Sequence, residues 1–273
     1  MAFYLQGRIC QLYADRLPTL LVVVLHVLPP AVFAIVHGSL LYRLKGVLFF
    51  ALTCLCTATV TESLSLRIGF PFGHYHFTRV MGPQVLGLPF LLVLAYLGIG
   101  YCSWILGILI LGIRGRPVVG YRTFALPMVA SFIMLAWDLS MEADWSTVDR
   151  AWIWRDGGLY FGVPLSNFFG WYLTAYLFFQ AFALYCRAHG AQSIPLSSHF
   201  WRMPILMYGI CAAGNLLILR LPMAPPIVSD ATGRGWVTMD IIIADGLISL
   251  FVMGSIAAIA WAKLRKSEAA SIQ

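Results

Sequence analysis

Long apolar stretches alternate with short polar connections along most of this chain. Seven stretches are long enough to cross a membrane, near residues 17–36, 44–64, 85–112, 124–142, 162–186, 203–221 and 238–262. A helix needs about 20 residues to cross a hydrocarbon core about 30 Å thick. The pattern predicts an all-α integral membrane protein with about seven transmembrane helices, forming one domain over residues 1–273. Pro29 and Pro30 predict that the first stretch is kinked or interfacial.

Two of the connections are unusually rich in aromatic residues and glycine. They are Gly69–Thr78, between the second and third apolar stretches, and Trp152–Trp171, which leads into the fifth. A connection between membrane helices needs only to be short and polar, so this composition predicts ordered loops that shape a site for a hydrophobic molecule. The candidate substrate-binding residues are Phe72, His74, Tyr75, His76, Trp152, Trp154, Tyr160, Phe161 and Trp171. The alternative is an aromatic belt that anchors helices at the membrane surface.

Composition and charge support the membrane assignment. Apolar residues make up 60% of the chain and charged residues 11%, with a mean hydropathy of +0.84. The net charge of +7 is spread over all the connections, so we expect no nucleic-acid partner. The positive-inside rule places the C-terminus on the cytoplasmic side. Almost all the acids fall on the other side, where we expect the site. The charged tail, residues 263–273, is expected to be short and mobile.

Four acids in or beside apolar stretches are candidate catalytic residues, namely Glu62, Asp138, Glu142 and Asp245. A charge at membrane depth costs a few kcal/mol or more and usually marks function or pairing. Asp138 and Glu142 are four residues apart, so they share a helix face. Mutual repulsion favours one protonated carboxyl beside one ionised carboxylate. The alternatives are an interfacial ion pair between Glu62 and Arg67 and a solvated helix end carrying Asp138 and Glu142.

The sequence predicts neither a metal nor a cofactor. The six cysteines include no C-x-x-C pair, and glycine-rich phosphate loops, G-x-S-x-G and H-E-x-x-H are absent from the sequence. His74 and His76 form an H-x-H pair, which is a weak ligand pattern without a further partner. A hydrogen-bonded histidine at an interface is the commoner outcome.

Several motifs together resemble a known family. They are Glu62, Gly69–Phe77, Gly82-Pro83, Gly87–Pro89, Asp138, Trp152–Trp154 and Tyr160–Trp171. Their combination is similar to the carotenoid-biosynthesis membrane family that contains the CruF-type carotenoid 1,2-hydratases and the bisanhydrobacterioruberin hydratases. The resemblance covers roughly residues 55–185. The family pattern often has an Asp-Pro pair shortly after the aspartate, where this chain has Met141–Asp144, so the resemblance assigns no role to Glu142.

The resemblance implies a hydratase, a carbon–oxygen lyase that adds water to the terminal C=C of an acyclic carotenoid. The product would be a tertiary alcohol, formed through a carbocation without a cofactor. Asp138 would donate the proton and Glu62 would activate the water, or the reverse, and Asn167 would orient the water. Protonating an alkene requires a strong acid in an apolar pocket, and aromatic faces stabilise the resulting cation. The substrate would be an isoprenoid or carotenoid drawn from the lipid bilayer.

Two other functions fit the same residues. A proton-initiated membrane terpene or prenyl cyclase would form the same cation in a drier pocket and capture it with an internal alkene. A non-enzymatic lipid carrier or transporter would use the buried acids as a proton relay. Hydration adds the mass of one water to the substrate, whereas cyclisation and transport add none. Substrate length and oligomeric state do not follow from the sequence.

Overall fold

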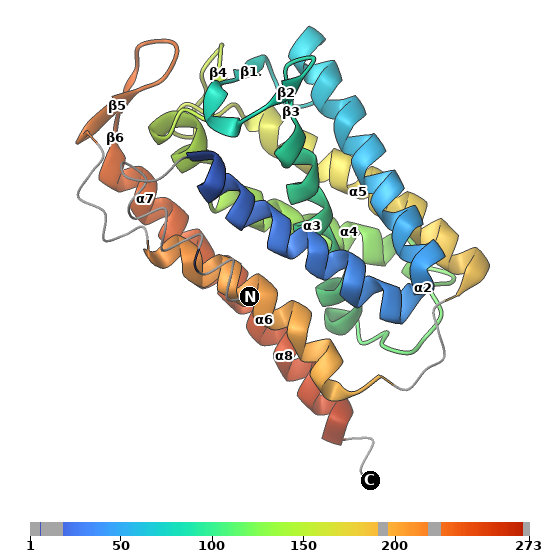
Figure 1. The fold of residues 1–273 in the computed structure, drawn as a ribbon. Coiled ribbons are helices and arrows are strands. Elements are labelled where there is room, and N and C mark those ends of the chain that lie inside the picture. Colours follow the sequence, from blue (N-terminus) through green and yellow to red (C-terminus); the bar gives the residue numbers. More distant parts are fainter. Residues whose placement is uncertain (1–5, 7–18, 191–195, 218–224, 270–273) are drawn as a thin grey trace.

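The computed structural model describes Gln6 and residues 19–190, 196–217 and 225–269, most of which belong to a bundle of long helices (Figure 1). The helices are α2 (Thr19–Ile68), α3 (Phe90–Ile110), α4 (Arg122–Leu139), α5 (Leu165–His189), α6 (Ser198–Leu217), α7 (Thr238–Leu247) and α8 (Gly254–Ala269). The π-helical segment Ile248–Met253 joins α7 to α8, so these two form one long rod.

The first two apolar stretches both belong to α2. The helix continues through Pro29 and Pro30, and its non-helical backbone angles occur at Arg43, with φ of 57° and ψ of 172°. The interruption therefore lies between the two apolar stretches and not at the prolines. Residues 17, 18 and 218–221, at the outer ends of two predicted stretches, lie outside the described residues.

Each apolar stretch coincides with helix, but the helices differ in hydropathy. Among the described residues, four helical segments are long and apolar enough to cross a membrane, namely Leu20–Ile68, Phe90–Ile110, Arg122–Val148 and Thr238–Ala269. Helices α5 and α6 carry Tyr, Trp, Arg and amide side chains that lower their hydropathy. The membrane character is therefore supported, and seven crossings stay a prediction.

Helix α3 forms the centre of the bundle, packing against α2, α4, α6 and α8. Most of its residues are buried, including Tyr96, Tyr101 and Trp104. Gly98 permits a close approach to α2, because a Cβ atom there would lie 2.5 Å from Cβ of Pro30. Small residues at such crossings let the backbones of membrane helices approach one another.

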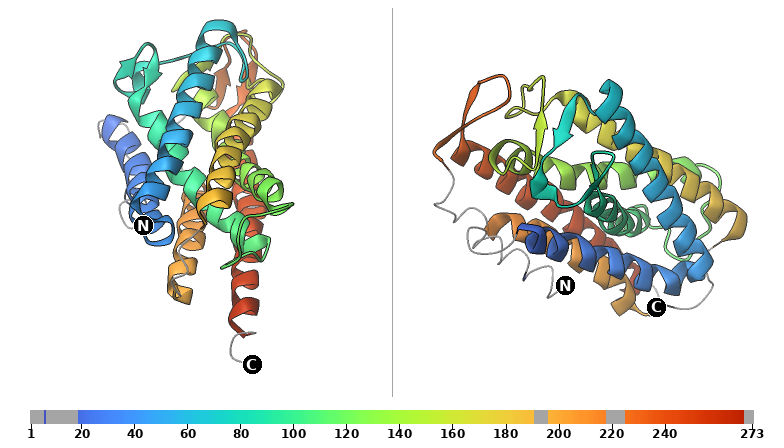
Figure 2. Two further views of the ribbon diagram at one scale, coloured as in Figure 1. Left: turned by 90° about the vertical axis from the view of Figure 1, so that its right-hand side faces the viewer. Right: turned by 45° about the horizontal axis from the view of Figure 1, so that its top comes forward.

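Three short antiparallel pairs of strands gather near one end of the bundle, opposite the C-terminal end of α8 (Figure 2). Strand β1 (Tyr75–Phe77) pairs with β4 (Trp152–Trp154), β2 (Gln84–Val85) with β3 (Leu88–Pro89), and β5 (Ile227–Ser229) with β6 (Gly235–Val237). The two aromatic connections are therefore ordered, and each contributes one strand of the β1–β4 ribbon.

The predicted mobile tail is helical over most of its length. Helix α8 continues to Ala269, so residues 263–269 belong to it, and residues 270–273 lie outside the described residues. The Glu268 carboxylate accepts hydrogen bonds from Arg202 on α6 at 3.1 Å. This pair fastens the end of α8 to the neighbouring helix.

Candidate functional site

The ribbon of β1 and β4 brings the two aromatic connections together. Tyr75 lies opposite Trp154, and Phe77 lies opposite Trp152. Side chains alternate between the faces of a strand, so these four rings share one face. That face looks into the bundle, with Tyr75, Trp152 and Trp154 each at most 6% exposed. The Tyr75 and Trp154 ring centroids are 4.7 Å apart.

Glu62, near the end of α2, is held by two phenol groups. Its Oε1 accepts a hydrogen bond from the Tyr96 hydroxyl at 2.6 Å, and its Oε2 accepts one from the Tyr75 hydroxyl. Burial and the adjacent Glu62 carboxylate raise the pKa of Tyr75 above its usual value, so Tyr75 remains a neutral donor. Two such donors favour the ionised form of a carboxyl group.

Asp138 has a poorer set of hydrogen bonds. It lies in the last turn of α4, is 0% exposed, and accepts a hydrogen bond at Oδ2 from the Asn167 amide at 3.3 Å. Its Oδ1 is buried and accepts no hydrogen bond from an N–H donor within the described part of the chain, and the Asp138 carboxyl shares a hydrogen bond with the Glu142 carboxyl. Asn167 is in place because α5 begins at Leu165, directly after the aromatic connection.

Glu142 follows the end of α4 and is held by two indole groups. Its Oε1 accepts hydrogen bonds from Trp152 Nε1 at 2.7 Å and Trp154 Nε1 at 2.8 Å. The tryptophans thus position a carboxylate as well as forming an apolar wall. The Asp138 and Glu142 carboxyl groups lie next to each other, as their spacing predicts.

The three acids form one buried cluster, because Asp138 interacts electrostatically with both Glu62 and Glu142. No Lys or Arg lines the cavity beside them, and no ion pair of the described residues involves these carboxyls. The predicted Glu62–Arg67 pair is absent from these ion pairs. Like charges this close disfavour ionisation of all three groups together. The arrangement therefore favours retention of at least one proton within the cluster.

A cavity of about 370 Å³ adjoins the acids. It is lined by Glu62, Phe72, Tyr75, Phe77, Leu92, Trp137, Met141, Glu142, Trp152, Trp154, Asn167 and Trp171. Trp171 stacks on Tyr96 with centroids 4.4 Å apart, which fixes the face of its indole ring. The lining combines aromatic faces with two carboxylates and one amide, a composition suited to cationic intermediates.

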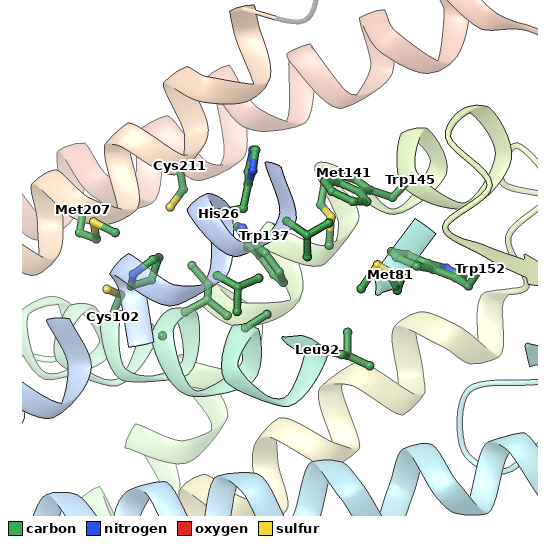
Figure 3. A pocket seen from close by; sticks show the side chains of 16 residues that line it. His26, Met81, Leu92, Cys102, Trp137, Met141, Trp145, Trp152, Met207 and Cys211 are labelled. Carbon is green, nitrogen blue, oxygen red and sulfur yellow. The ribbon is translucent and has the colours of Figure 1, made fainter. Parts of the chain in front are cut away.

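A larger apolar cavity of about 730 Å³ lies directly alongside the first (Figure 3). Both are lined by Leu92, Trp137, Met141 and Trp152. The larger one extends between α2, α3, α4 and α6, from Trp152 and Met81 toward Cys102 and Met207 (Figure 3). Its lining contains no charged carboxylate and consists mainly of aliphatic, sulfur-containing and aromatic side chains. Together the cavities form an apolar space with the acids at one end.

Several predicted site residues lie away from this space. His74 and His76 are exposed on the ribbon, and His74 Nδ1 is 2.9 Å from an Asp156 carboxylate oxygen. Phe161 packs against Trp236 of β6, with centroids 5.6 Å apart. Asp245 lines a separate small cavity, to which Met141 also contributes. These four residues therefore do not line the cavity beside the acids. Asp138 and Tyr160 are also absent from its lining, and Asp138 lies behind it, next to Glu142.

Some site residues do not stand out in the sequence. Tyr96 and Trp137 occur within apolar stretches, where aromatic residues are ordinary core material. The structure gives Tyr96 a hydrogen bond to Glu62 and places Trp137 in the wall of both cavities. One sequence feature could have indicated Tyr96. A polar phenol group in an otherwise apolar helix can reach a buried acid on a neighbouring helix, as the Tyr96 hydroxyl on α3 reaches Glu62 on α2. Recognising it requires knowing the helix packing.

The described residues contain no group of three or more His, Cys, Asp or Glu side chains arranged to hold a metal ion. A family model described as carotenoid biosynthesis protein matches residues 19–229, which include the whole acid cluster and both cavities. No curated protein and no solved structure matches the chain.

Proposed function

Since the chain belongs to the carotenoid biosynthesis protein family, we propose that it adds water to the terminal C=C of an acyclic carotenoid and forms a tertiary alcohol. The observation that carries this proposal is the position of the acids. Three buried carboxyl groups form one cluster among aromatic rings, and two of them, Glu62 and Glu142, line one end of a long apolar space. Acid–base chemistry on the end of an isoprenoid chain requires this combination.

In this proposal each cavity binds a different part of the substrate. The apolar cavity receives part of the polyene chain, and the cavity lined by Glu62 and Trp171 receives the end group. The remaining chain extends toward the lipid. This orientation places the terminal double bond beside the acids.

Asp138 donates the proton in this proposal. Its neighbours Glu62 and Glu142 each accept two strong hydrogen bonds that favour a charged carboxylate, whereas Asp138 accepts one long one. Asp138 is therefore the carboxyl that best retains a proton. Transfer of that proton to the CH carbon of the alkene leaves a tertiary cation on the adjacent carbon. The faces of Trp171 and Trp154 stabilise the positive charge.

Water then attacks the cation and forms the C–O bond. The Glu62 carboxylate, oriented by Tyr75 and Tyr96, accepts the proton that the attacking water releases. Return of this proton to Asp138 restores the starting state, so the reaction consumes one water and no net proton. The Asn167 amide, which contacts Asp138, helps to orient the water.

Pigment analysis in a host that accumulates lycopene tests this function. Expression in water enriched in heavy oxygen should yield a product heavier by one water, with the label in a new hydroxyl group. The D138N variant, expressed to the same level, should leave the pigment unchanged. A new pigment of unchanged mass would instead indicate cyclisation, and unaltered pigments with the normal protein would contradict an enzymatic role on this substrate.

A further inference from the structure

A further small cavity shares Met141 with the cavity beside the acids. It holds about 220 Å³ and is lined by Ser140, Met141, Asp144, Asn215, Ile242 and Asp245. Four of these six residues carry polar side chains, which contrasts with the largely apolar cavity of Figure 3. None of the steps proposed above uses this cavity.

Asp245 is the residue that requires an explanation. It is 5% exposed, and neither of its carboxylate oxygens has a hydrogen-bond partner of good geometry among the described residues. It lies beside Asp144, a second acid, whose backbone N–H is the one protein donor close to the Asp245 carboxyl group in the described part of the chain. A buried carboxyl with so few protein donors is costly, and bound water is the usual way to satisfy it. The side chain thus indicates a hydrated cavity.

The rest of the lining can support such water. The Asn215 amide nitrogen donates hydrogen bonds to Ser140 Oγ and to Ser249 Oγ, each at 2.9 Å. These bonds hold polar groups from α6, the end of α4 and the α7–α8 rod around one space. One water molecule occupies roughly 30 Å³ in the liquid and needs two to four polar partners. The cavity therefore has polar partners for a single water.

Two side chains connect this cavity to the acids. Met141 lines it and also both of the other cavities. The Tyr160 hydroxyl is buried without a hydrogen-bond partner among the described residues, and it interacts electrostatically with Asp245, Asp138 and Glu142. Burial and these carboxylates raise the pKa of Tyr160 beyond its usual range, so the phenol stays neutral and can both donate and accept.

A hydration site needs one water for each turnover, and the apolar cavity offers few groups to hold it. We propose that Asp245 and Tyr160 hold the water molecule that captures the cation and deliver this water to the acid cluster. This inference rests on the proposed hydration. Asp245 and Tyr160 are positioning residues. Water capture yields the alcohol, with the released proton going to a carboxylate. Without water, the cation returns a proton from an adjacent carbon to a carboxylate, and an alkene forms again.

Turnover in deuterated water separates these two outcomes. Protonation places deuterium on the end group, so a captured cation becomes a deuterated alcohol and an uncaptured one becomes a deuterated alkene. With membranes containing the protein and added lycopene, we expect D245L to lower the ratio of alcohol to deuterated alkene at least tenfold. The D245N variant keeps a polar side chain, so its ratio of alcohol to deuterated alkene should fall less. The control D240L changes an exposed aspartate in the first turn of the same helix and should keep the normal ratio.

Y160F provides a second variant if D245L does not accumulate in membranes, and it should also lower the ratio. A normal ratio in a folded D245L or Y160F would overturn the proposal. An equal loss of alcohol and deuterated alkene would also overturn the proposal, because such a loss would indicate that Asp245 and Tyr160 have a purely structural role. Absence of alcohol with the unmodified protein would instead refute the proposed hydration, so the two failures are distinguishable.

Discussion

Three carboxyl groups in one cluster differ mainly in what donates to them. Phenols donate to Glu62, indoles to Glu142, and one amide donates to Asp138. Hydrogen-bond donors stabilise a carboxylate, and burial favours the neutral acid. The same residue type can therefore act as acid or base in one small space. Spacing along the chain predicts that Asp138 and Glu142 are close, but it does not predict the approach of Glu62 or the donors to any of the three acids.

Replacement of the acids by amides tests the assigned roles. D138N and E62Q should each lower conversion by about 100-fold or more, because a positioned acid or base contributes about 10²–10⁴ in rate. The control D156N removes an acid whose side chain is 72% exposed beside His74, and conversion should be unchanged. Product formation is measured by chromatography at matched protein levels. Normal conversion by D138N would exclude Asp138 as the proton donor.

Helix α5 packs closely against the loop before β1 at Gly170. A Cβ atom at Gly170 would lie 2.6 Å from the Phe72 ring and 3.0 Å from the backbone of Pro71. Gly170 therefore allows the first aromatic connection to rest directly on α5, which places Phe72 in the cavity wall. The glycine content of the aromatic connections predicts an ordered loop. The partner of each glycine is known only from the packing.

Paired glycine substitutions test this contact. G170A should destabilise the protein by about 1–3 kcal/mol, as overpacking of a tight contact typically does. The control G209A lies on α6, where a Cβ atom would meet nothing within 4 Å. That change should leave stability unchanged or raise it by about 0.5–1 kcal/mol, since alanine favours helix over glycine. Thermal unfolding in detergent measures both, and a G170A protein as stable as G209A would contradict the packing.

In the molecule as a whole, helices far apart in the sequence, from α2 to α6, enclose one apolar space. Met81 and Trp152 lie toward the acids, and Cys102 and Met207 lie further along (Figure 3). The acids lie near the end of the bundle that carries the short strands, opposite the end of α8 (Figure 2). An isoprenoid substrate therefore has a defined direction, with its end group at the acids.

Partial filling of the larger cavity tests that direction. C102F places a ring in the part distant from Trp152, so it should lower conversion of a long acyclic carotenoid at least tenfold. A short prenyl chain with the same end group does not reach that region and should react normally. C102A leaves the cavity open and serves as the control. Competition between the two substrates, followed by mass spectrometry, measures the effect. Equal losses for both would contradict this binding mode.

The sequence predicts much of this architecture from local properties. Apolar length predicts helices at all seven stretches, the resemblance selects Glu62 and Asp138, and the four-residue spacing adds Glu142 beside Asp138. The structure brings the three together. Asp245 also attracts attention as an intramembrane acid, but the structure assigns it to a separate cavity. The exposed His74 and His76 share a motif with the buried Tyr75, because alternate strand residues face opposite sides.

Apolar length, buried charge and aromatic connections are properties of single segments, so the chain alone indicates a helical membrane protein with an acidic site. Only the packing decides which donors reach each acid. The pairing of Tyr75–Phe77 with Trp152–Trp154 joins segments about 75 residues apart, and the contact between Tyr96 and Glu62 joins two helices. Such contacts depend on how helices cross and on which faces meet, and no local pattern in a single sequence encodes them.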